Sequence, residues 1–179
     1  MSTFSPANLA RAAGLPKLFS QDCQLCGLRS ADTLCAACAG ELPLWSAGGC
    51  PRCGEQATPG QLCGACLAHP PAFDHTIAAF CYAFPLDRLV QSFKFNANLA
   101  LADLFASALA AAAGAARPDA LIALPLARKR LAERGFNQSA LLAERVARRL
   151  GIDYAAHGLL KVRDTPPQAS LDRRARLKN

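Results

Sequence analysis

The sequence lacks the marks of a secreted protein. Residues 1–20 contain no apolar run of signal-peptide length, because Pro6, Arg11 and Pro16 interrupt them. Disulfide-rich chains are usually small and secreted, so a disulfide scaffold explains the nine cysteines of this sequence poorly. We expect residues 1–20 to form a loose leader and the thiols to stay reduced, as they do in the cytoplasm.

A membrane span is also lacking. The alanine-rich stretch Leu99–Ala116 has about the length of a span, but alanine contributes little burial free energy and Asp103 lies inside the stretch. Its larger apolar residues recur at helical spacing, which predicts a helix packed on a sheet. These residues are Leu101, Leu104, Phe105 and Leu109.

Acidic residues are scarce in the last third of the chain. The net charge is +7, but residues 128–179 contain thirteen Lys/Arg against five Asp/Glu, whereas residues 1–127 contain seven against eight. A local excess of positive charge suits a polyanion, such as the phosphates of a nucleotide-like ligand or a nucleic-acid backbone. The alternative is a solvated helix face followed by a basic tail.

Cysteine, by contrast, is abundant and stands in four Cys-x-x-Cys pairs. Residues 23–38 read CQLCGLRSADTLCAAC and residues 50–66 read CPRCGEQATPGQLCGAC, so the stretch is an internal repeat. Both copies begin with C-x-x-C-G and end with L-C-x-A-C. The cysteines are Cys23, Cys26, Cys35 and Cys38 in the first copy, and Cys50, Cys53, Cys63 and Cys66 in the second.

This spacing predicts two structural zinc ions. The two sulfurs of a Cys-x-x-Cys pair grip one ion from the same side of a tight turn, and Gly27 or Gly54 allows the positive φ that such a turn needs. Two pairs complete a tetrahedron of thiolates without an open position, which is typical of structural zinc. The repeat favours sequential ligation, one ion per copy; a cross-braced arrangement, first pair with third, is the alternative. Iron–sulfur clusters usually have other spacings.

The residues around the repeat suggest how it joins the rest of the chain. Trp45, in the link between the two copies, is expected to be their shared packing anchor. Thr76–Phe84 is rich in aromatic and branched residues and predicts a strand, in which Cys81 would be a small buried hydrophobe. A helix is expected to follow Pro85, with one apolar face.

The second half of the chain reads as the front of an α/β unit. Asp119–Leu126 is a continuous apolar run that predicts a buried parallel strand. A basic loop over residues 128–138 and a helix over Ser139–Leu150 are expected next, with Gly151 ending the helix. In such units ligands bind beyond the carboxyl ends of the strands. Candidates for further strand are residues 152–154 and 159–162.

Taken together, the sequence resembles the ComF family of competence-associated, phosphoribosyltransferase-like proteins. Besides the cysteine repeat, the resemblance is carried by FKF at Phe93–Phe95, LPL at Leu124–Leu126 and RGFNQ at Arg134–Gln138 followed by LLA. The later L-x-K-x-R, T-P-P-Q-x-x-L and R-x-x-R-x-x-N segments also fit. The resemblance runs from Cys23 to Asn179.

This resemblance implies a small zinc-ribbon module followed by an incomplete α/β type I phosphoribosyltransferase-like domain, with a parallel sheet and flanking helices. The implied organisation is a leader over residues 1–20, a double zinc ribbon over 21–69 and the N-terminal part of the transferase-like domain over 72–179. In the family, phosphoribosyl pyrophosphate binds at a D-D-x-x-T-T-G-x-T loop, which these 179 residues do not contain. We therefore expect a C-terminally truncated chain without phosphoribosyltransferase turnover, which would bind this ligand only in a full-length form.

The resemblance also implies a role in competence and DNA uptake. The candidate ligand-binding residues are Arg134, Gly135, Phe136, Asn137 and Gln138. Their structural alternative is a helix-entry turn in which Asn137 or Gln138 caps backbone amides. A second hypothesis is a non-catalytic zinc module that holds single-stranded DNA through residues 128–178, with Phe136 or Trp45 stacking on a base. A third is that the ribbons dock a helicase-like competence protein.

Overall fold

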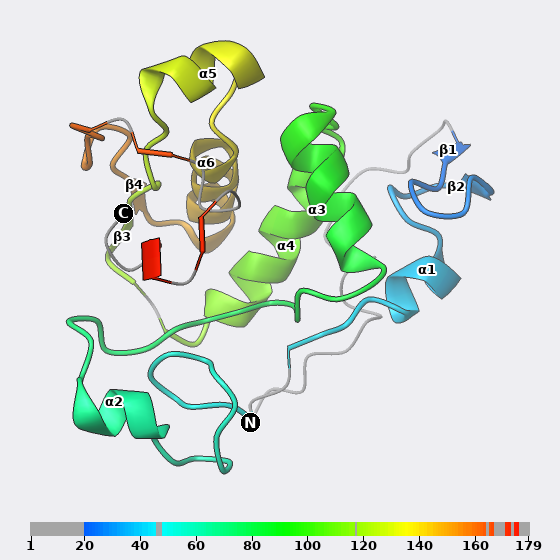
Figure 1. Ribbon diagram of the computed structural model, residues 1–179. Coiled ribbons are helices and arrows are strands. Elements are labelled where there is room, and N and C mark those ends of the chain that lie inside the picture. The colour runs from blue at the N-terminus through cyan, green and yellow to red at the C-terminus, as the bar shows by residue number, and fades with distance from the viewer. Residues whose placement is uncertain are drawn as a thin grey trace. The chain divides into compact units, whose positions relative to one another are not determined.

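The computed structural model describes residues 20–45, 48–116, 118–163, 165–166, 171–172 and 174–175. The chain divides into two units, Met1–Pro118 and Asp119–Asn179 (Figure 1). The expected leader and most of the basic terminus lie outside the described residues. Among the helices of the described part, none is both long enough and apolar enough to cross a membrane.

The cysteine repeat folds as two copies of one local pattern. In the first copy, β1 (Gln21–Asp22) pairs antiparallel with β2 (Arg29–Ser30), and α1 (Ala36–Gly40) follows. In the second, a single bridge between Gly49 and Gln56 takes the place of the strand pair, and α2 (Gly64–Ala68) follows. Each helix begins directly after a cysteine in extended backbone, Cys35 or Cys63.

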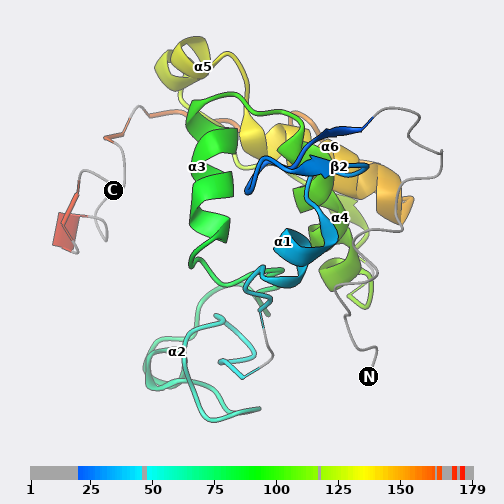
Figure 2. The ribbon, with the colours of Figure 1, turned by 90° about the vertical axis from the view of Figure 1, so that its right-hand side faces the viewer.

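Two helices supply the largest apolar core of the first unit. α3 (Leu86–Phe95) and α4 (Leu101–Ala113) lie side by side in both views (Figures 1 and 2). The rings of Phe93 and Phe105 meet edge to face with their centroids 5.5 Å apart. Ala102 and Ala106 of α4 are fully buried as well. The helix predicted within Leu99–Ala116 is thus confirmed, but within its unit it packs on α3 and not on a sheet.

The strand predicted over Thr76–Phe84 is wrong. Only Phe80 forms a bridge, antiparallel to Leu44 in the link between the two ribbons, and the rest of the segment is irregular. Cys81 donates its N–H to the carbonyl of Pro43 at 2.8 Å, and its side chain is exposed rather than buried. A strand needs a partner of matching length, and the link offers only a few residues.

The second unit is a parallel pair of strands connected through two helices. β3 (Ala120–Leu121) pairs with β4 (Asp153–Tyr154), and α5 (Arg128–Arg134) and α6 (Gln138–Leu150) lie between them in the chain. α6 packs against both strands. Parallel strands need such a crossover connection, so this is the βαβ arrangement that the sequence predicted.

Three details of the second unit differ from expectation. The buried strand predicted over Asp119–Leu126 is paired only at Ala120 and Leu121, and Ile122 and Leu124 are exposed rather than buried. Residues 128–134 form α5 and not a loop, because arginine, lysine, leucine, alanine and glutamate are all good helix formers. Residues 159–162 form no strand and are exposed. Gly151 ends α6 in the left-handed conformation, as predicted, with φ of 68°.

Candidate metal centres

Each cysteine quartet converges on one point. Within each quartet the four Sγ atoms all lie within 4.8 Å of one another. The sulfurs of Cys26 and Cys35 are 3.8 Å apart, and those of Cys53 and Cys63 are 3.6 Å apart. A tetrahedron with zinc–sulfur bonds of about 2.3 Å has sulfur–sulfur edges of roughly 3.8 Å. The spacing therefore fits one four-coordinate zinc ion per quartet.

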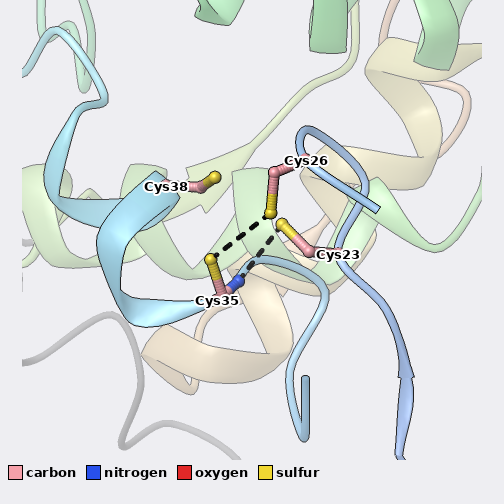
Figure 3. A group of neighbouring side chains, drawn as sticks. All are labelled: Cys23, Cys26, Cys35 and Cys38. Carbon is pink, nitrogen blue, oxygen red and sulfur yellow. Dashed lines mark hydrogen bonds between the residues drawn. The ribbon is translucent and has the colours of Figure 1, made fainter. Parts of the chain in front are cut away.

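The local fold explains why the sulfurs meet. In the first quartet, Cys23 and Cys26 come from the turn after β1, whereas Cys35 and Cys38 come from the start of α1, and the sulfurs point toward one another (Figure 3). The turn closes where the N–H of Gly27 donates to the carbonyl of Cys23 at 2.9 Å. Gly27 has a φ of 72°, as its place after the pair predicted.

The second quartet repeats this construction. The N–H of Gly54 donates to the carbonyl of Cys50 at 2.9 Å, and Gly54 has a φ of 77°. Cys63 precedes α2 with the same extended backbone that Cys35 adopts before α1. The quartets are sequential, one in each copy of the repeat, and not cross-braced. All nine cysteines are free thiols, so no sulfur of either quartet is taken up in a disulfide.

The thiols of each quartet differ strongly in acidity. Burial alone would raise the pKa of Cys23, but the N–H groups of Cys26, Cys35 and Leu25 bring it down to about 6. In the second quartet the N–H of Cys53, with those of Cys63 and Arg52, lowers the pKa of Cys50 to about 6 against the effect of burial. Backbone dipoles thus prepare one thiolate in each quartet.

The last cysteine of each quartet behaves in the opposite way. Burial, followed by contacts with the neighbouring cysteine side chains, raises the pKa of Cys38 and of Cys66 to about 12. Four close sulfurs cannot all carry negative charge unless a cation balances them. A divalent ion supplies that charge, so zinc binding to these quartets should release protons. With four thiolate ligands and no open position, the two zinc ions are structural.

Two supporting residues near these centres give no sequence signal. A Cβ added to Gly49 would lie 2.8 Å from the carbonyl oxygen of Gly54, so glycine is required where the two arms of the second turn approach. Asn98 donates its side-chain amide to Oε1 of Gln24 at 2.7 Å, which ties the first metal turn to the connection between α3 and α4. The role of Gly49 depends on its closeness to Gly54, and that of Asn98 on its bond to Gln24.

The segment Arg134–Gln138 forms the turn between α5 and α6. Gly135 ends α5 with a φ of 77°. Oδ1 of Asn137 accepts the N–H groups of Ser139 and Ala140 at 2.9 and 3.3 Å, and its Nδ2 donates to the carbonyl of Leu124 at 3.1 Å. Nη1 of Arg134 donates to Oε1 of Gln138 at 2.7 Å. Gly135 and Asn137 therefore have the roles expected of a helix-entry turn. A ligand-binding role for the segment stays a prediction.

Replacing Asn137 with alanine should destabilise the second unit by about 1–2 kcal/mol, because α6 loses its N-cap. Urea denaturation and amide exchange at Ser139 and Ala140 would measure this. The matched control is Asn137→Asp, which keeps the capping oxygen but replaces the donor to Leu124 with a carboxylate oxygen. Its loss of stability should be smaller than that of Asn137→Ala. Equal stability of the alanine variant and the wild type would contradict the cap.

The repeated local fold and its paired four-sulfur centres define a double zinc ribbon. The family described as "Double zinc ribbon domain" matches residues 15–67, which include all eight cysteines of the two quartets. No solved structure matches the chain significantly.

Curated relatives extend the match beyond the ribbons. Competence protein F of Haemophilus influenzae is 32% identical over 157 residues, covering 82% of this chain and 68% of that protein. DNA utilization protein YhgH of Escherichia coli O157:H7 is 34% identical over 138 residues, covering 73% of this chain and 61% of that protein. Competence protein ComFC of Bacillus subtilis is 27% identical over 138 residues, covering 70% and 58%. The chain belongs to the ComF family of competence proteins, and it spans about three fifths of the length of YhgH.

Proposed function

We propose that this protein handles DNA during its uptake or utilisation. The double zinc ribbon is a metal-stabilised module, and the basic residues of the second unit hold the phosphate backbone of single-stranded DNA. The observation that carries the proposal is the run Arg128, Lys129 and Arg130 on the first turn of α5, where the first two are exposed to solvent. Relatives named for competence and for DNA utilisation support the same conclusion.

The distribution of charge supports the second unit as the binding element. Residues 128–179 carry thirteen Lys/Arg and five Asp/Glu. Within α6, Arg148 pairs with Glu144 at 2.8 Å, so part of its charge is compensated. Among the residues that the structure describes, no ion pair involves Arg128, Lys129 or Arg130. A basic surface of this kind binds phosphates without regard to base sequence.

A second candidate function is binding of phosphoribosyl pyrophosphate in a longer form of the protein. It is favoured by the parallel pairing of β3 with β4 around α6, which is the topology expected for the start of a transferase-like domain over residues 72–179. In that form, Arg134–Gln138 would lie in or beside the ligand-binding loops, since this segment follows β3. We predict no phosphoribosyltransferase turnover by the 179-residue chain, which has no D-D-x-x-T-T-G-x-T loop.

Two further parts of the proposal concern partners and location. The ribbons themselves are a candidate docking module for a helicase-like protein of the same process, because residues 21–69 carry two Lys/Arg against four Asp/Glu and offer little to a polyanion. Nine free thiols suit a reducing compartment, so we place the protein in the cytoplasm.

The proposed function is tested by fluorescence anisotropy with a labelled oligo(dT) and the zinc-loaded protein. We expect binding whose logarithmic affinity falls linearly with the logarithm of salt concentration, with a slope of about −0.7 for each phosphate neutralised. Double-stranded DNA of equal length is the comparison. Affinity that does not fall as salt rises, or no binding at low salt, would rule out this function.

A further inference from the structure

Exposed aromatic side chains are concentrated around helix α3. Tyr82, Phe84 and Phe95 are 68%, 76% and 70% exposed, respectively. The two aromatic residues that sequence reasoning favoured for base stacking, Trp45 and Phe136, are instead half-buried. The structure thus moves the best candidates for stacking from the second unit and the ribbon link to the segment around α3.

The exposed residues of α3 form one stripe along the helix. Arg88, Gln91 and Phe95 are spaced i, i+3 and i+7, which places them on the same face, and all three are exposed. Leu89 and Phe93 are buried and lie on the opposite face, where Phe93 packs on Phe105 of α4. Phe95 is therefore a solvent-facing residue and not the margin of the core.

Tyr82 and Phe84 are also exposed and lie in the residues just before α3. We call the surface made by Tyr82, Phe84, Arg88, Gln91 and Phe95 the α3 strip. The helix is about 15 Å long, so the strip offers rings before its start and at its end, with a guanidinium and an amide between them.

The chemistry of the α3 strip suits single-stranded nucleic acid. A flat π face accepts any base by stacking, and a guanidinium plane both stacks and donates hydrogen bonds. An apolar protein partner would instead be matched by an aliphatic patch, whereas the α3 strip combines aromatic rings with a guanidinium and an amide. Arg88 and Lys94 give α3 two positive charges against the one negative charge of Asp87.

We infer that the α3 strip is a stacking platform for the bases of single-stranded DNA. This inference rests on the proposed function and adds to it. Residues 1–118 carry seven Lys/Arg and seven Asp/Glu, so they contribute no net electrostatic attraction to DNA. The strip contributes by stacking, while the basic residues of the second unit contribute by contacts with phosphate. The contribution of the phosphate contacts should fall as salt rises, whereas that of stacking should not change the salt slope.

The test measures oligo(dT) binding by the zinc-loaded full chain with Phe84→Leu and Phe95→Leu, singly and together. Leucine keeps apolar bulk and removes the π face. Stacking is worth about 1–3 kcal/mol per base, so each substitution should weaken binding roughly fivefold or more without changing the salt slope. Phe84→Tyr and Phe95→Tyr keep the π face and should bind like the wild type. Phe73→Leu, at an exposed aromatic outside the strip, is the matched control.

The outcomes separate this inference from the function beneath it. If the wild type binds and the leucine variants bind equally well, the α3 strip is not a stacking platform, although the proposed function stands. If the wild type does not bind, the proposed function fails and the inference falls with it. Unchanged zinc content together with an unchanged circular-dichroism spectrum in every variant shows that a loss of binding is not a loss of fold. Leucine variants that lose affinity together with the tyrosine variants would also overturn stacking.

Discussion

Replacing Cys50 with serine is expected to lower the zinc content from two ions per chain to one and to unfold the second ribbon. Cys50 is 1% exposed and lies in the second sulfur quartet. A serine hydroxyl is a poor zinc ligand, and three thiolates leave the tetrahedron incomplete. Structural zinc contributes about 10–16 kcal/mol to the folding of small zinc modules, which have little apolar core of their own. Metal analysis and limited proteolysis within residues 48–69 would measure both effects.

The chain contains its own control for this experiment. Cys81 is the ninth cysteine; it belongs to neither quartet and its side chain is exposed. Cys81→Ser should therefore retain two zinc ions and the protease resistance of the wild type. Thiol titration should find one reactive thiol in the zinc-loaded wild type and none in Cys81→Ser. Two zinc ions retained by Cys50→Ser would show that this quartet does not hold its ion as described.

Replacing Arg128, Lys129 and Arg130 with alanine is expected to weaken binding of single-stranded DNA by more than roughly tenfold at low salt. Each basic residue that contacts a phosphate contributes about 0.7 to the salt slope, so the slope should fall by about 2. Alanine is a strong helix former, so α5 itself should persist. Anisotropy titrations at several salt concentrations would give both quantities.

A charge-conserving variant separates charge from shape. Arg128→Lys with Arg130→Lys keeps both positive charges on the first turn of α5 and should keep most of the affinity and the slope. Arg29→Ala removes an exposed arginine of the first unit, which pairs with Asp22 at 3.4 Å, and should change neither. An unchanged salt slope in the triple alanine variant would show that α5 does not contact phosphate.

The sequence was most informative where geometry is encoded locally. The Cys-x-x-Cys-Gly spacing predicted both the sulfur quartets and the positive φ of Gly27 and Gly54, because ligands and turn lie within a few residues of each other. The cap at Asn137 and the stop at Gly151 were predictable for the same reason. These features need no knowledge of what packs against them.

Prediction failed where a distant partner decides the outcome. The residues of Thr76–Phe84 have a high preference for strands, but within the described part of the chain they pair only with the short link near Leu44. Asn98 gave no signal as the partner of Gln24, since 74 residues separate the two. The α3 strip could not be predicted, because in the sequence Phe95 looks like one more core residue. Only the structure shows that it lies on the exposed face of α3.

The bridge between Leu44 and Phe80 has an architectural consequence for the ribbons. It brings together the two points at which the chain leaves for the second ribbon and returns from it. A module whose ends lie side by side can change without displacing the segments that flank it, because those segments need no rearrangement. The first ribbon and the α3–α4 pair, joined directly by the bond between Gln24 and Asn98, make up the host. Changes confined to the second ribbon, including a change in its length, should therefore leave both ends of its host in place.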